Sequence, residues 1–222
     1  LASFGLGALI QAVVIRPLAQ APVLSIVVVF IGLMVIFNSV AGLLFGYTIR
    51  PFPSPFPQDA WFGSRFMSPH EVGVIGVTLL VMLILYAFFR FTTLGLAMRA
   101  AAQQPDSSRL VGIHVGGMLM LGWGLAGATG AVGGMMVAPS VFLDPNMMTG
   151  VLIYAFAGAL IGGIDNPAGA VLGGFIVGVL ENLIGSYVIG TELKLSVALI
   201  LIIAVLIVRP AGLLGKTIVS KV

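Results

Sequence analysis

Three polar side chains stand inside long apolar stretches of the 222-residue chain and are its first candidates for chemistry: Glu181, Asn182 and Asn38. A charged carboxylate at the centre of a helix in an apolar medium costs about 2.5–3.5 kcal/mol, so Glu181 needs a proton, a hydrogen bond or water to compensate. One interpretation is that these groups line a polar pathway. The other is that they form hydrogen bonds that join neighbouring helices, and the sequence leaves both open.

Other chemical patterns lack the context that their chemistry requires. Residues 122–127 match G-x-G-x-x-G, but no strand precedes them and they lie in an apolar stretch, so we expect no dinucleotide site there. Gly215-Lys216-Thr217 resembles the end of a phosphate-binding loop, but Pro210 occupies the position of its first glycine. The two histidines, His70 and His114, are far apart, and the chain has no cysteine. We therefore expect no catalytic residue, no metal site, no cofactor and no enzymatic activity of its own.

The composition indicates that the surroundings of this chain are largely lipid. Apolar residues make up 59% of the sequence and charged residues 8%, with a mean hydropathy of +1.19. Soluble domains are about 45–50% apolar and about 25% charged. The composition therefore excludes a soluble enzyme and a disordered protein. Ten Lys and Arg against seven Asp and Glu are too few and too dispersed for a nucleic-acid partner, and we expect none.

Runs without charged residues divide the chain into candidate membrane spans. A bilayer core of about 30 Å needs about 20 residues of helix, and the alternation typical of strands is absent. We therefore predict an all-α, polytopic transmembrane helix bundle that forms one domain over residues 1–222. The sequence opens at Leu1 inside an apolar stretch, so we expect the first span to be N-terminally truncated. About seven spans are predicted, at residues 1–15, 23–47, 71–90, 116–138, 147–164, 168–188 and 193–208.

Glycines inside these spans predict close helix packing. Gly158 and Gly162, like Gly169 and Gly173, are four residues apart and fall on one helix face. Small residues on one face allow helix backbones to approach closely in lipid. We expect the last four predicted helices to form a compact bundle through such glycines.

The distribution of Lys and Arg predicts the orientation of the spans. When the C-terminal tail is placed in the cytoplasm, seven of the ten cations fall on inner segments and three on outer ones, as the positive-inside rule requires. The inner cations are Arg16, Arg90, Arg99, Arg109, Arg209, Lys216 and Lys221, and the outer ones are Arg50, Arg65 and Lys194. The loop at about 91–115 is therefore predicted to face the cytoplasm, and the proline-rich loop at about 48–70 to face outward.

The inner loop contains the signals of two short helices. Alanine and glutamine favour helix up to Gln104, and Pro105 interrupts it. Asp106 or Ser107 is expected to cap a second helix, and Gly112 to end it. A small helix displayed between two spans is suited to insertion into a groove of a partner, although a turn on the membrane surface has a similar sequence.

Several stretches, in order along nearly the whole chain, carry a family pattern. They are Arg16-Pro17-Leu18; Arg50-Pro51-Phe52-Pro53; Gly95-Leu96-Ala97-Met98-Arg99-Ala100 with Pro105, Arg109 and Gly112-Ile113; Gly162-Gly163-Ile164 with residues 167–174 and Glu181-Asn182; and Arg209-Pro210-Ala211-Gly212-Leu213-Leu214-Gly215. Together they resemble the permease subunits of bacterial branched-chain amino-acid ABC importers, the LivH type.

The resemblance implies a multi-pass protein of the bacterial cytoplasmic membrane that works with partners. A second permease subunit, the same or related, completes the path; cytoplasmic ATP-binding subunits hydrolyse ATP; and an extracytoplasmic solute-binding protein delivers an amino acid. The residues that match the loop contacting the ATPase are Arg99, Ala100, Ala101, Pro105, Asp106, Arg109, Gly112 and Ile113. Glu181, Asn182 and Asn38 are the candidates for the translocation path.

Two departures from the family pattern keep the cargo open. Family members often have Glu followed by Arg where this chain has Gln11-Ala12, and usually a neutral residue where it has Asp165. A sugar-type permease of the same superfamily is therefore an alternative. A secondary carrier or channel is another, but it needs several polar groups at mid-membrane, where Glu181 is the single candidate.

Overall fold

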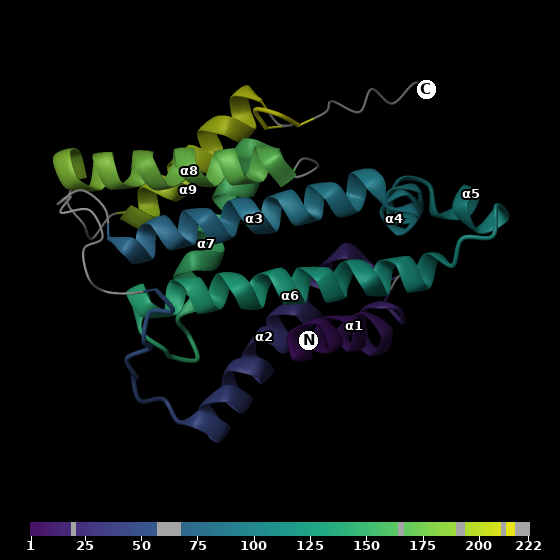
Figure 1. Ribbon diagram of the computed structural model, residues 1–222, viewed down its shortest axis with the longest axis horizontal. Helices are drawn as coiled ribbons and strands as arrows, with labels where there is room; N and C mark the ends of the chain where they lie inside the picture. The colour runs from purple at the N-terminus through teal and green to yellow at the C-terminus, as the bar shows by residue number, and fades with distance from the viewer. Residues whose placement is uncertain (19–20, 57–67, 164–166, 190–193, 210–211, 216–222) are drawn as a thin grey trace. The chain divides into compact units, whose positions relative to one another are not determined.

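A computed structural model describes residues 1–18, 21–56, 68–163, 167–189, 194–209 and 212–215 (Figure 1). Arg65, Asp165, Lys216 and Lys221 lie outside the described residues. Within them the chain is helical, with an isolated β-bridge between Arg50 and Leu143 and no named strand, so the predicted all-α fold is confirmed. The helices are α1 (Ala2–Ile10), α2 (Val23–Phe45), α3 (Pro69–Phe91), α4 (Thr93–Gln103), α5 (Pro105–Leu110), α6 (Val115–Val141), α7 (Met148–Gly162), α8 (Pro167–Ile184) and α9 (Lys194–Val208), with π-helical turns η1 (Gln11–Ile15) and η2 (Gly185–Ile189).

Each predicted span coincides with a helix. Among the described residues, α2, α3, α6 and α8 are long and apolar enough to cross a bilayer. Shorter apolar helices are formed by α1 together with η1 and by α7, and α9 has 15 residues. Helix α6 is longer than predicted at both ends. These helices follow from the sequence because a chain in lipid must satisfy its backbone hydrogen bonds within itself.

The structure divides into two compact units, of which the first comprises residues 1–146. In this unit α1 packs against α6 without side chains between the backbones, since a Cβ atom on Gly7 would collide with the Trp123 carbonyl. The ring of Phe30 on α2 stacks on that of Trp123, with 5.7 Å between ring centroids. Helix α1 therefore packs closely along α6, and α2 contacts α6 through this aromatic pair.

The second unit, residues 147–222, is built on the glycines of α7 and α8. A Cβ atom on Gly158 would meet the Gly174 backbone at 2.7 Å, and one on Gly162 would collide with the Gly169 carbonyl. The predicted close packing is therefore confirmed for this helix pair. Its buried core is formed by Ala157, Ile161 and Val177, on which side chains of α9 pack.

The C-terminal residues of this unit complete the end of α7. The backbone N–H of Leu213 donates to the carbonyl of Ile161 at 2.7 Å, and that of Leu214 donates to the carbonyl of Gly162 at 3.0 Å. The last carbonyls of a helix lack partners within the helix, so these hydrogen bonds satisfy groups that would otherwise be unpaired. Gly212 makes the required turn with φ +77°.

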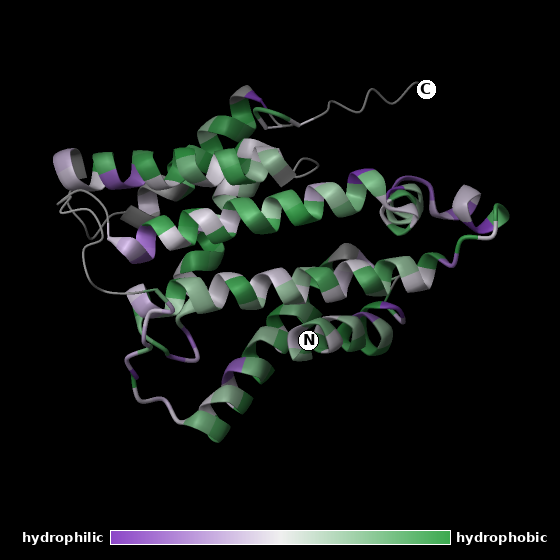
Figure 2. Cartoon of the chain, viewed as in Figure 1, coloured by the Kyte–Doolittle hydropathy of each residue, from purple (hydrophilic) through white to green (hydrophobic). Residues whose placement is uncertain are grey.

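Helices α2 and α3 expose most of their apolar side chains. Figure 2 shows hydrophobic residues along both helices, and almost none of either helix is buried inside the structure. A soluble protein does not leave two such helices uncovered. Together with their lengths, this identifies the chain as a multi-pass membrane protein.

Candidate functional site

The site predicted on the inner loop begins at a sharp junction between α3 and α4. Thr92 has extended backbone angles and caps α4, because its hydroxyl oxygen accepts a hydrogen bond from the N–H of Gly95 at 3.0 Å. The same hydroxyl donates to the carbonyl of Phe88 at 2.6 Å. A Cβ atom on Gly95 would collide with that carbonyl, so the start of α4 lies directly against the end of α3.

Helix α4 is fixed by one buried face. Gly95, Met98 and Ala101 recur every three residues and are buried, and α4 packs against α3 and α6. Ala101 is therefore part of the packing, whereas Arg99 is exposed and Ala100 is half-buried. Of these three predicted site residues, Arg99 presents the most open side chain.

Helix α5 begins at Pro105, two residues earlier than a cap at Asp106 requires. The N-cap is Gln104, which makes no side-chain cap, so the expectation that Asp106 or Ser107 caps this helix is wrong. Proline is favoured in the first turn because it needs no N–H partner there, and it sets the start of the helix instead. The Ser107 hydroxyl donates to the side-chain oxygen of Gln104 at 3.1 Å.

Asp106 and Arg109 form an exposed ion pair on α5, with 3.1 Å between Arg109 Nη1 and Asp106 Oδ1. The acid lies in the first turn and the base in the last, which also suits the helix dipole. Exposed pairs of this kind contribute about 0–1 kcal/mol. Both charges therefore remain available to a partner.

Gly112 ends α5 as the sequence predicts. It has φ +85°, and two hydrogen bonds form a Schellman motif: Gly112 N–H to the Arg109 carbonyl at 3.1 Å and Ile113 N–H to the Ser108 carbonyl at 3.0 Å. Ser108 is 3% exposed, so α5 turns this one residue inward. The turn directs the chain back toward α6.

Sequence reasoning missed two apolar residues at the tip of α5. Leu110 is 89% exposed and Val111 is 76% exposed, beside the Asp106–Arg109 pair. Their signal in the sequence was an apolar pair in an otherwise polar segment bounded by Pro105 and Gly112. A small apolar tip flanked by charges is typical of a protein docking element.

Glu181, the second predicted site, lies between helices of the 147–222 unit. Its carboxylate on α8 lies close enough to the Tyr154 side chain on α7 to interact with it electrostatically. Asn182 beside it donates to the Gly178 carbonyl of its own helix at 3.1 Å. The partner of Glu181 therefore comes from a neighbouring helix and not from the adjacent residue in the sequence.

Asn38 belongs to the other unit and has a different partner. Its Nδ2 donates to Oδ1 of Asn146 at 3.0 Å, which links α2 to the end of the first unit. The structure thus gives Asn38 and Glu181 separate polar partners. No group of three or more metal-ligating side chains occurs in the part of the chain that the structure describes.

Comparison with known proteins decides the family. Residues 1–206 match the family described as "Branched-chain amino acid transport system / permease component". The chain belongs to this family. The permease is also 31% identical over 219 residues to the high-affinity branched-chain amino acid transport system permease protein LivH of Salmonella typhimurium, covering 96% of this chain and 71% of LivH.

Other relatives of the permease carry related names. The high-affinity branched-chain amino acid transport system permease protein BraD of Pseudomonas aeruginosa is 32% identical over 219 residues, covering 96% of this chain and 71% of BraD. The fructose import permease protein FrcC of Rhizobium meliloti is 30% identical over 167 residues, covering 66% of this chain and 44% of FrcC. No solved structure gives a significant match.

Proposed function

We propose that this permease forms part of the translocation path of an ATP-driven importer in a bacterial cytoplasmic membrane, and that its cargo is a branched-chain amino acid. The family match and the similarity to LivH and BraD over 96% of the chain support this cargo. The fructose permease aligns with 66% of the chain, which makes a sugar the weaker alternative.

The observation that carries the proposal is the exposed tip of α5 on an anchored α4. Arg109, Leu110 and Val111 extend into the surroundings, whereas Met98 and Ala101 hold α4 against the first unit. Figure 2 shows hydrophilic residues along the segment that contains α5. The tip presents the charged and apolar groups that a groove on an ATP-binding subunit would take.

The packing around α4 suggests how a push on α5 reaches the membrane helices. Gly95 lies against the carbonyl of Phe88, so α4 cannot move without displacing the end of α3. The buried face of α4 also contacts α6, and closely packed side chains transmit displacements because they leave no space to absorb them. Closure of the ATP-binding subunits would thus tilt α3 and α6 together.

The remaining partners are proposed from the family and from uncovered surfaces. Energy comes from cytoplasmic ATP-binding subunits, and ATP hydrolysis is theirs. An extracytoplasmic solute-binding protein docks on the outer loops. A second permease subunit, the same or related, covers part of the apolar surface that α2 and α3 expose. Glu181, Asn182 and Asn38 are assigned to the translocation path.

Reversing charges on α5 tests whether this helix couples the permease to the ATP-binding subunits. The permease is reconstituted with its ATP-binding subunits and solute-binding protein, and leucine uptake and ATP hydrolysis are measured. We expect Arg109→Glu to reduce uptake about tenfold, the effect of losing one important interface residue. The double variant Asp106→Arg/Arg109→Glu restores the pair on α5 but not the contact with a partner, and it should stay impaired.

Recovery of uptake in that double variant would contradict the proposal, because only the local stability of α5 would then matter. Leu110→Asp provides a second test, with Leu110→Met as its matched control. Only the aspartate should impair uptake, since methionine preserves an apolar tip.

A substrate panel and omission of the ATP-binding subunits test the cargo and the class of transporter. Leucine, isoleucine and valine should be taken up in preference to fructose, and uptake should stop without the ATP-binding subunits. Preference for fructose would transfer the assignment to the sugar-type alternative. Sustained uptake without those subunits would indicate a secondary carrier or channel.

A further inference from the structure

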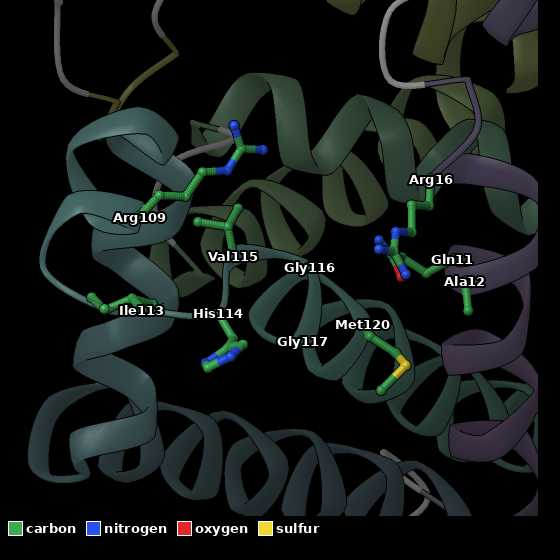
Figure 3. A pocket seen from close by; sticks show the side chains of 11 residues that line it. Gln11, Ala12, Arg16, Arg109, Ile113, His114, Val115, Gly116, Gly117 and Met120 are labelled. Atoms are coloured by element: carbon green, nitrogen blue, oxygen red, sulfur yellow. The ribbon is translucent and has the colours of Figure 1, made fainter.

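An open pocket of about 540 Å³ lies between the end of the first helix and the start of α6 (Figure 3). Gln11 and Arg16 approach from η1 and its C-cap on one side, and Arg109, Ile113 and His114 lie on the other. All the lining residues belong to the first unit. Its walls therefore join two segments about a hundred residues apart in sequence.

The side chains that line this pocket are basic or uncharged. Arg16, Arg109 and His114 line it, and none of its lining residues is acidic. Arg109 pairs with Asp106, but Arg16 has no ion pair within the described ranges. An uncompensated guanidinium attracts anions, and phosphate is well suited because its oxygens match the fork of N–H donors.

Gln11 supplies a second, independent indication of a ligand. Gln11 is 3% exposed and lines the pocket, and its side-chain amide makes no hydrogen bond to another described residue. No fully enclosed side-chain nitrogen or oxygen lacks a partner among the described residues, so the Gln11 amide is open to the pocket and can bond to a molecule there. Figure 3 shows it beside Arg16, directed toward the start of α6.

The start of α6 adds backbone donors to the same pocket. The N-cap residue His114 makes no side-chain cap, so the first N–H groups of this 27-residue helix remain available. Gly116 and Gly117 follow, and a Cβ atom on Gly116 would meet nothing within 4 Å. Open glycines at a helix start allow an anion to approach the backbone closely.

We propose that this pocket binds a phosphate group, held by the Arg16 guanidinium, the Gln11 amide and the first turn of α6. Since the pocket lies at the ends of membrane helices, the phosphate of an anionic phospholipid is the favoured source, and basic pockets between helices on the cytoplasmic side are known to take such headgroups. A bound headgroup would join η1 to the linker that follows α5.

Lipid binding to the purified full-length permease, without partner subunits, tests this proposal separately from transport. Native mass spectrometry compares dioleoyl phosphatidylglycerol with dioleoyl phosphatidylcholine. We expect phosphatidylglycerol to bind about tenfold more tightly, the contribution of one charge-assisted interaction. Arg16→Gln should reduce this preference to less than about twofold, and Arg90→Gln, which removes the same charge outside the pocket, should leave it unchanged.

Gln11→Glu is a second variant that preserves side-chain volume. It places a carboxylate beside Arg16, so it should abolish the preference by occupying the guanidinium, and thermal unfolding verifies that it folds. Millimolar inorganic phosphate distinguishes the sources: displacement of the lipid supports a soluble phosphate ligand, and no displacement supports the headgroup. Equal binding of the two lipids by the wild type, or equal losses in Arg16→Gln and Arg90→Gln, overturns the proposal.

Discussion

The backbone N–H of Ile113 donates a 3.0 Å hydrogen bond to the carbonyl of Ser108 and thereby closes the C-terminus of α5. This bond requires Gly112 between them to adopt φ +85°. The exposed tip formed by Leu110 and Val111 is presented by this turn. The geometry of the proposed docking element therefore depends on one glycine.

Replacement of Gly112 by valine should loosen this turn. A left-handed backbone costs an L-residue about 1–2 kcal/mol, and a β-branched side chain tolerates it poorly. The backbone amides at positions 112 and 113 should then exchange hydrogen faster in the purified valine variant than in the wild type. Gly112→Asn is the matched control, since asparagine adopts this conformation more readily, and exchange as fast as in the valine variant would contradict the explanation.

Gly162→Ala should separate α7 from α8. The added Cβ atom collides with the Gly169 backbone, and overpacking of this kind costs about 1–3 kcal/mol. A Cβ atom on Gly150, on the same helix, would meet nothing within 4 Å, so Gly150→Ala should leave stability unchanged or raise it slightly. Thermal unfolding in detergent measures both, and similar midpoints for the two variants would refute the close approach.

Tyr154 and Glu181 should contribute to stability as a pair. A double-mutant cycle of Tyr154→Phe and Glu181→Leu is expected to show a coupling of about 0.6–2 kcal/mol, the range of polar interactions between membrane helices, because the two side chains lie close together. Tyr187→Phe is the control because Tyr187 is exposed on η2. The cycle could instead show no coupling while Glu181→Leu keeps normal stability but loses uptake. That result would assign Glu181 to the translocation path alone.

The His70 side chain should hold the proline-rich outer loop against α6 through two hydrogen bonds. Its Nε2 lies 3.1 Å from the Met136 carbonyl, which can only accept, so Nε2 carries the proton and Nδ1 accepts from the Ser54 hydroxyl at 3.0 Å. His70→Ala removes two hydrogen bonds worth about 1 kcal/mol each. Limited proteolysis should then cut near residues 51–56 sooner.

The other histidine provides the control for that experiment. His114 makes no side-chain cap on α6, so His114→Ala should not change cleavage of the outer loop. Equal acceleration in both variants would show that the loop is held by something other than His70.

The sequence alone determined the helices and most of their ends. Spans without charged residues predict helices because lipid offers the backbone no hydrogen bonds, and Gly112 predicts the end of α5 because its turn needs a left-handed residue. It predicted the start of α5 wrongly, since Pro105 and not a polar cap begins that helix. These are local effects, which a few neighbouring residues decide.

Only the tertiary structure decided which polar groups meet. Tyr154 faces Glu181, Asn38 bonds to Asn146, and Gln11 lies with Arg16 opposite the start of α6. It also decided that Ser108 is buried while Leu110 and Val111 are exposed, the reverse of what their polarity suggests. These pairings join residues distant in the chain, because packing of whole helices, through glycine contacts such as Gly162 on Gly169, sets which faces oppose each other.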